Sequence, residues 1–133
     1  YFSFINFNLG VLIIMENNSV NEVPESVKGW NWGAFMFNMF WGLGNKSYLP
    51  LLVLLPIPVF GFIWAIFCGA LGNGWAWKKS GFQNTPEDIA TFKQIQDTWN
   101  RAGLWMFIIV IASIIVTLIF VGILGAIAAN QSY

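Results

Sequence analysis

The sequence predicts an all-α fold, that of a small polytopic membrane protein, and three observations lead to this prediction. Of the 133 residues, 57% are hydrophobic and 9% are charged, whereas a typical soluble domain has roughly 25% charged residues. A domain of this size buries only about two thirds of the surface that its chain exposes, so this much apolar surface is better matched to lipid than to water. Finally, the uncharged runs 59–77 and 104–129 are each long enough for a transmembrane helix.

The N-terminal segment, residues 1–29, is first apolar and then polar. Residues 1–15 carry no charge, and no positive stretch precedes them as it would in a secretory signal. Met15 is followed by the polar stretch ENNSVNEVPESVKG, which is typical of an ordinary N-terminus. Two hypotheses stay open: translation starts at Met15 and residues 1–14 lie outside the native protein, or residues 1–15 are a real apolar segment too short to span a membrane unaided.

A single membrane domain is predicted over residues 30–133, and it begins with an interrupted aromatic segment. The run WNWGAFMFNMFWGLG would extend about 21 Å as a helix, short of a hydrocarbon core of about 30 Å. Pro56 and Pro58 should stop or kink any helix, because proline lacks the N–H and clashes with the preceding turn. Residues 30–55 therefore read as two half-helices around Gly42–Ser47 that lie in the interface, re-enter, or together form a third span.

The two transmembrane helices are predicted from length and charge. Residues 59–77 contain nineteen uncharged residues between the proline break and the lysines at 78 and 79, and Pro58 suits the first turn of this helix. Residues 104–129 contain twenty-six residues without a charge, which leaves length for tilt.

A polar loop, residues 78–103, joins these spans and is predicted to contain a short amphipathic helix over 85–101. Thr85 can cap the helix, Pro86 suits its first position, and acidic Glu87 and Asp88 match the positive end of its dipole. Ile89, Phe92, Gln96 and Trp99 share one face, which is mainly apolar. This helix is expected on the membrane surface or packed on its own bundle.

Eight tryptophans stand out, and seven of them fall near a predicted membrane boundary. The two W-x-W pairs suggest stacking platforms for a ligand, but residues two apart on a helix point about 200° away from each other. The positions favour an aromatic belt, in which the ring is apolar and its N–H reaches the headgroup layer. The predicted membrane-interface residues are Trp30, Trp32, Trp41, Trp75, Trp77, Trp99 and Trp105.

Small residues recur at helical spacing in both predicted spans. Such residues let helix backbones approach closely in lipid. Two interpretations stay open: packing within one subunit, or packing against a second copy or a larger complex. The predicted helix-packing residues are Gly61, Ala65, Gly69, Gly122, Gly125, Ala126 and Ala129.

The residues that carry most enzyme chemistry are scarce. The chain has no histidine and a single cysteine, Cys68, and its six basic residues balance six acidic ones. We therefore expect no catalytic residues, no cofactor, no metal site and no nucleic-acid partner. The nearest polar groups in the predicted membrane segments are Asn38, Asn45 and Asn73. For Asn38, which interrupts an aromatic helix face, the expected role is a cap or an interhelical hydrogen bond.

Four motifs give the chain a resemblance to a known group of proteins. GWNWGAF (29–35), WGLGNKSY (41–48), GNGWAW (72–77) and FKQIQDTW (92–99) occur in this order. Together they resemble a family of short uncharacterised bacterial integral membrane proteins with the motifs GWNWGAF, WGxGNK, GNxWAW and FKxxQxxW. The resemblance covers about residues 28–103 and implies one membrane domain but no activity. Gly74 departs from it, since an acidic residue is expected there, and so does the long 104–129 helix.

The functional prediction combines these observations. The chain is expected to be a non-enzymatic integral membrane protein, an accessory or structural subunit of a larger membrane complex or a self-associating scaffold, whose partners are the lipid bilayer and other membrane subunits or itself. The alternative is a small transporter or pore that uses the broken helices around Gly42–Asn45 and Pro56–Pro58. With the resemblance, the positive-inside rule predicts the bacterial cytoplasmic (inner) membrane, with loop 78–103 cytoplasmic because it holds four basic residues.

Overall fold

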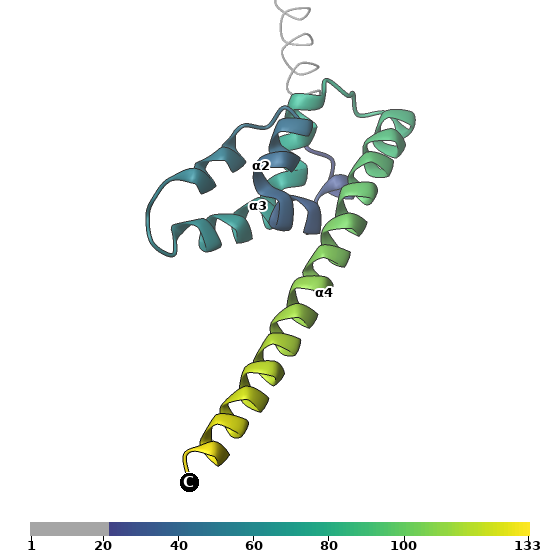
Figure 1. The fold of residues 1–133 in the computed structure, drawn as a ribbon. Helices are drawn as coiled ribbons and strands as arrows, with labels where there is room; N and C mark the ends of the chain where they lie inside the picture. The colour runs from purple at the N-terminus through teal and green to yellow at the C-terminus, as the bar shows by residue number, and fades with distance from the viewer. Residues whose placement is uncertain (1–21) are drawn as a thin grey trace, which may run out of the picture.

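The computed structural model describes residues 22–133, and every regular element within this range is a helix (Figure 1). In chain order these elements are η1 (Glu25–Val27), α2 (Trp32–Gly44), η2 (Leu49–Leu54), α3 (Phe60–Ser80) and α4 (Pro86–Gln131). The prediction of an all-helical fold is confirmed for these residues. The apolar segment 1–15 and the two hypotheses about Met15 lie outside them.

The proline-interrupted region consists of α2, the short 3₁₀ helix η2, and a turn at Pro56–Pro58. The chain reverses after α2, where the Ser47 N–H donates to the Gly42 carbonyl at 2.9 Å and Lys46 has a left-handed φ of 55°. Helix α3 begins only at Phe60, because Val59 also has a left-handed φ, of 67°. Pro58 therefore precedes the helix, and its predicted place in the first turn is wrong.

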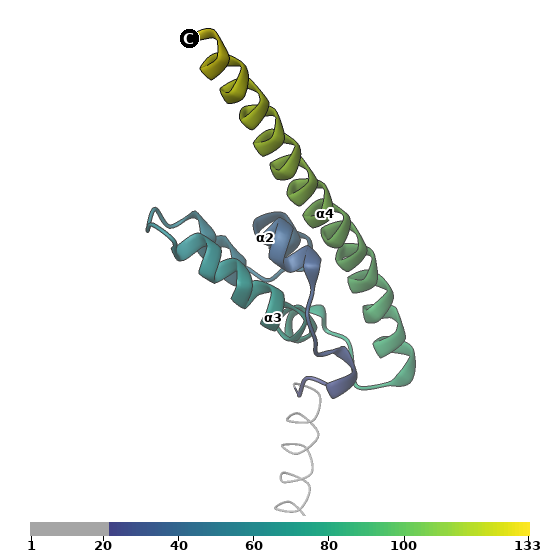
Figure 2. The same ribbon diagram turned by 90° about the horizontal axis from the view of Figure 1, so that it is seen from below.

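Helix α3 ends at Gly81, which has a φ of 75°, the left-handed conformation that commonly terminates helices. The helix is also bent. Figures 1 and 2 show that its first half runs at an angle to its second half. The rings of Trp64 and Trp75, one from each half, stack with their centroids 6.0 Å apart. The bend lies in the glycine-rich stretch between these rings, as is common for helix kinks.

Helix α4 is one continuous helix of 46 residues, where the sequence predicts two helices over 85–101 and 104–129. Its predicted start is confirmed, because the Thr85 hydroxyl accepts a hydrogen bond from the Asp88 N–H and Pro86 is the first helical residue. The predicted break is absent because only Ala102 and Gly103 separate the two segments, and a helix tolerates one internal glycine at a cost of about 1 kcal/mol.

The two parts of α4 have different surroundings. Its first part packs against α2 within a helical head, while its second part extends away from the other elements (Figures 1 and 2). From 104 to 131 every side chain is exposed apart from Phe107, which is partly buried. We call residues 22–103 the head and residues 104–131 of α4 the stem.

Among the described helices, α4 alone is long and apolar enough to cross a membrane. The second predicted span, over 59–77, is therefore not confirmed, and neither is a polytopic arrangement. Helix α3 is less apolar than its first half suggests, because its second half contains glycine, asparagine and two lysines.

Candidate functional site

The centre of the head is a set of hydrogen-bonded amide side chains around Gln96 of α4. The Gln96 Oε1 accepts hydrogen bonds from Asn31 Nδ2 at 2.9 Å and from Trp41 Nε1 at 3.1 Å. The Gln96 Nε2 donates to Asn45 Oδ1 at 2.6 Å. Gln96 is only 5% exposed, so these bonds satisfy an amide that would be costly to bury without partners.

Asn31 joins all three α-helices of the head. Its Oδ1 caps α2 by accepting from the Ala34 N–H at 3.1 Å. Its Nδ2 donates to Asn73 Oδ1 on α3 at 2.7 Å as well as to Gln96 on α4. Its backbone N–H donates to the Gly69 carbonyl at 2.9 Å. This single residue therefore fixes where α2 begins and how α2 lies against both neighbours.

Two further amides extend the hydrogen bonding. Asn45, just after α2, donates to the Trp41 carbonyl at 2.8 Å and so satisfies an acceptor at the end of that helix. Asn100 of α4 accepts from the Trp32 N–H at 2.7 Å, a donor that the first turn of α2 leaves without an intrahelical partner. We call these five side chains and the Trp41 indole the amide network: Asn31, Trp41, Asn45, Asn73, Gln96 and Asn100.

The network draws on each of the four sequence motifs GWNWGAF, WGLGNKSY, GNGWAW and FKQIQDTW. Asn31 lies in GWNWGAF, Trp41 and Asn45 lie in WGLGNKSY, Asn73 lies in GNGWAW, and Gln96 lies in FKQIQDTW. Segments up to 65 residues apart in sequence thus meet at one buried centre. Residues from the four motifs therefore supply the hydrogen bonds that hold the helices of the head together.

Helices α2 and α4 cross at a pair of glycines, Gly33 and Gly103. A Cβ added to Gly33 would lie 2.6 Å from the Trp99 carbonyl oxygen, and one added to Gly103 would lie closer still to the backbone of Trp32. Backbone atoms cannot move aside as a flexible side chain can. The crossing therefore requires glycine on both helices.

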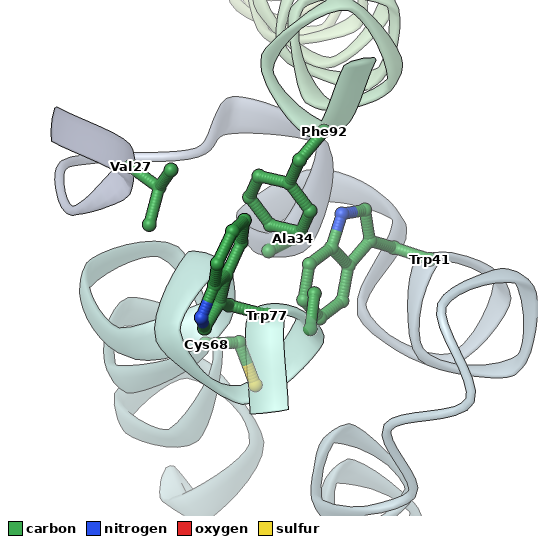
Figure 3. Close-up of a cluster of buried hydrophobic side chains, with 7 residues drawn as sticks. Val27, Ala34, Trp41, Cys68, Trp77 and Phe92 are labelled. Carbon is green, nitrogen blue, oxygen red and sulfur yellow. The ribbon is translucent and has the colours of Figure 1, made fainter. Parts of the chain in front are cut away.

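Hydrophobic side chains enclose the network. Figure 3 shows the rings of Trp41, Trp77 and Phe92 around Ala34, with Cys68 beside them. Trp77 and Phe92 meet edge to face, with ring centroids 5.2 Å apart, and tie α3 to α4. The Trp77 Nε1 is buried without a hydrogen-bond partner, in contrast to the Trp41 Nε1.

These positions change the interpretation of two tryptophans. Trp41 is fully buried and Trp77 is 2% exposed, so neither ring reaches a headgroup layer and the membrane-interface prediction is wrong for both. The prediction failed because aromatic residues near polar ones occur both at a membrane boundary and in the buried interior of a small helical domain. The same prediction stays untested for Trp30, Trp32, Trp75, Trp99 and Trp105.

The predicted helix-packing residues fall into two groups. Ala65 and Gly69 are buried in the head, where Trp30 covers Gly69. A Cβ added to Gly61 would lie 3.6 Å from Val53 of η2. On the stem, a Cβ added to Gly122 or Gly125 would meet no atom within 4 Å. The other two predicted helix-packing residues on the stem, Ala126 and Ala129, are exposed.

Two cavities flank the amide network. One, of about 190 Å³, lies between the ends of α2 and α3 and the start of α4, and its lining includes Lys46, Lys79 and Gln96. The other, of about 140 Å³, includes Lys28, Lys93 and Asn31 in its lining. The amides between them are neutral and engaged with one another, which suits them to holding helices in register. Within residues 22–133 no three acidic, histidine or cysteine side chains gather as metal ligands would.

Sequence reasoning identified only part of this centre. It selected Asn45 and Asn73 only as polar groups in the predicted membrane segments, and the structure places both in the network. For Asn38 the expected cap or interhelical bond is wrong, because its amide donates to the Ala34 and Phe35 carbonyls of its own helix. It missed the central role of Gln96, although a glutamine between Phe92 and Trp99 on an apolar face was a usable signal.

Comparisons of the chain with protein-family models, with curated proteins and with solved structures find no match.

Proposed function

We propose that the chain is a non-enzymatic integral membrane protein that serves as an accessory subunit of a larger membrane complex, with the stem as its transmembrane helix. One observation carries this proposal: residues 104–131 form an uncharged helix with apolar side chains on all sides and almost no contact with the head. A helix that is hydrophobic all round needs either a protein interior or a bilayer around it. Its length of about 42 Å exceeds a hydrocarbon core of about 30 Å.

The small residues on the stem support an accessory role. Gly122 and Ala126 are four residues apart, as are Gly125 and Ala129, and all four share one face. In lipid such a face favours a second helix, because it allows close backbone contact where the hydrophobic effect offers nothing. The proposed partner is a transmembrane helix of another subunit.

The orientation and the family resemblance belong to the same proposal. Lys78, Lys79, Lys93 and Arg101 all lie on the head side of the stem. The positive-inside rule then favours a cytoplasmic head and a C-terminus on the other side of a bacterial cytoplasmic membrane. The four motifs support membership of the resembled family of short membrane proteins.

Transport receives less support. The amides next to the broken helices, Asn38 and Asn45, are engaged with carbonyls and side chains of the same chain. A pathway for a solute would need polar groups free to contact it.

The test is purification from the native membrane in lipid nanodiscs. We expect a second membrane protein to co-purify in stoichiometric amount. Gly125→Leu should abolish the association, because it fills the small-residue face. The matched control is Leu124→Ile, which lies on the opposite side of the stem and should leave the association unchanged. Recovery of the chain alone, or equal effects of both variants, would refute the accessory role.

A further inference from the structure

The head carries an apolar projection that the amide network leaves uncovered. It consists of η2, the Pro56–Pro58 turn and the first half of α3, and we call residues 49–67 the arm. No charged residue occurs from 47 to 77. The exposed apolar side chains of the arm are Leu49, Leu52, Leu54, Leu55, Ile57, Val59, Phe62, Ile63, Ile66 and Phe67. A contiguous exposed apolar surface of this kind marks a contact with protein or membrane.

The arm is a fixed structure. The Trp64 indole of α3 donates to the Leu49 carbonyl of η2 at 3.0 Å, and Val53 of η2 packs against Gly61 of α3. Trp64 also stacks on Phe60, with ring centroids 5.7 Å apart. The two sides of the arm are therefore held together from within, and its apolar side chains face outward.

The position of the arm relative to the stem follows from two contacts. The Trp77 ring meets Phe92, and Asn31 bridges Asn73 and Gln96. Moving four residues back along α3 thus corresponds to moving four residues forward along α4. The two helices are antiparallel, and the arm points toward the end of the molecule at which the stem lies (Figures 1 and 2).

This register limits how far the arm reaches. Phe60 lies thirteen residues before Asn73, and the same step forward from Gln96 leads to Ile109. The bend in α3 shortens the distance that the arm extends along the axis of α4. The tip of the arm therefore lies no closer to the C-terminus of α4 than the level of Ile109. Beyond Ile109 the stem continues to Gln131, about 33 Å further and enough to cross a hydrocarbon core of about 30 Å. The arm therefore ends where the stem enters the membrane.

We propose that the arm lies in the boundary between headgroups and acyl chains of the leaflet that the stem enters, as a second membrane contact that does not span. The inference rests on the proposed transmembrane role of the stem. The occupant of its surface is phospholipid, because the bilayer around the stem is continuous with the level of the arm. Exposed aromatic rings at this level, Phe62 on the arm and Trp105 on the stem, match the belt typical of that boundary.

The experiment measures membrane depth in the full chain. Single cysteines are introduced in a Cys68→Ala background, spin-labelled, and placed in nanodiscs of phosphatidylcholine and phosphatidylglycerol. Ile57→Cys and Leu54→Cys report on the arm, and Val116→Cys reports on the stem. Ile95→Cys is the matched control, since Ile95 is an isoleucine on the head with an exposed fraction of 43%, against 54% for Ile57. Collision with oxygen and with a water-soluble nickel complex gives the depth of each label.

We expect both arm labels to collide with nickel several-fold less often than the Ile95 label, and to lie at a shallower depth than the Val116 label. Nickel access at the arm equal to that at residue 95 would overturn the inference, because the arm would then lie in water. Arm labels as deep as residue 116, or on the far side, would overturn it too, because α3 would then cross the membrane. A water-exposed label at residue 116 would refute the transmembrane stem itself and, with it, the inference.

Discussion

The two parts of α4 belong to one helix, yet they meet different surroundings. From Pro86 to Gly103 the helix presents one packed face, with Phe92, Gln96 and Gly103 buried and charged residues directed outward. From 104 to 131 it is apolar on every side and almost free of contacts with the head. The comparison teaches that helix formation is common to both parts, while the distribution of polar residues around the axis decides what each part packs against.

The sharpest test of this difference compares one glycine from each part. Gly103→Ala should lower the free energy of unfolding of the head by more than about 3 kcal/mol, because the new methyl group meets the backbone of Trp32. Gly125→Ala should cause no loss, because it meets open space and alanine favours a helix. Unfolding in mixed detergent micelles, followed by tryptophan fluorescence, measures both. Equal effects would contradict the described crossing.

The next test removes the centre of the amide network. Gln96→Ala should lower the free energy of unfolding by about 3 kcal/mol, since it deprives Asn31, Trp41 and Asn45 of a buried partner. Gln94→Ala is the control, because Gln94 is an exposed glutamine on the same helix and should change the free energy by no more than about 0.5 kcal/mol. The same micelle titration applies, and a harmless Gln96→Ala would show that the network is not stabilising.

A smaller difference separates the two buried indoles of the head. Trp41→Phe and Trp77→Phe remove the same atoms, but only the Trp41 N–H has a hydrogen-bond partner. Trp41→Phe should therefore cost about 1–2 kcal/mol more in the free energy of unfolding. Because each variant also loses one fluorophore, unfolding is better followed by circular dichroism. A larger cost at residue 77 would mean that its N–H does have a partner.

The smallest expected effect is at the start of α4. Thr85→Ala removes the hydroxyl that accepts from the Asp88 N–H and should cost about 1 kcal/mol. Thr98→Ala on the same helix should change stability by less than about 0.5 kcal/mol, because its hydroxyl donates only to a carbonyl that the helix already uses. Thermal unfolding in detergent distinguishes the two. Equal melting temperatures for both variants would argue against a stabilising cap.

The sequence predicted the features that depend on local chemistry. The Thr85-Pro86 start, the proline interruption before α3 and the uncharged stem all follow from residues within a few positions of each other. It did not predict the continuity of α4, because polarity changes at Leu104 while the backbone has no reason to break there.

The amide network was harder to predict because its members are distant in sequence. Gln96 and Asn31 are 65 residues apart, and nothing near either residue indicates that they meet. The same limit explains the misassigned tryptophans. Trp77 precedes Lys78, and Trp41 lies four residues before Asn45. Such positions suit both a membrane boundary and the margin of a buried polar centre, and only the tertiary contacts of the two rings distinguish these alternatives.

The continuity of α4 has a mechanical consequence. With no hinge between the stem and the head part of α4, a tilt of the stem would turn the whole helix about the Gly33–Gly103 crossing. A tilt of about 10° about this point would move a position 18 residues away by about 5 Å, given a rise of 1.5 Å per residue. The same tilt would displace Gln96, on the shorter side of the crossing, by about 2 Å. That is enough to stretch its hydrogen bonds, so if the stem spans a bilayer as proposed, a tilt caused by a change in bilayer thickness would reach the interior of the head.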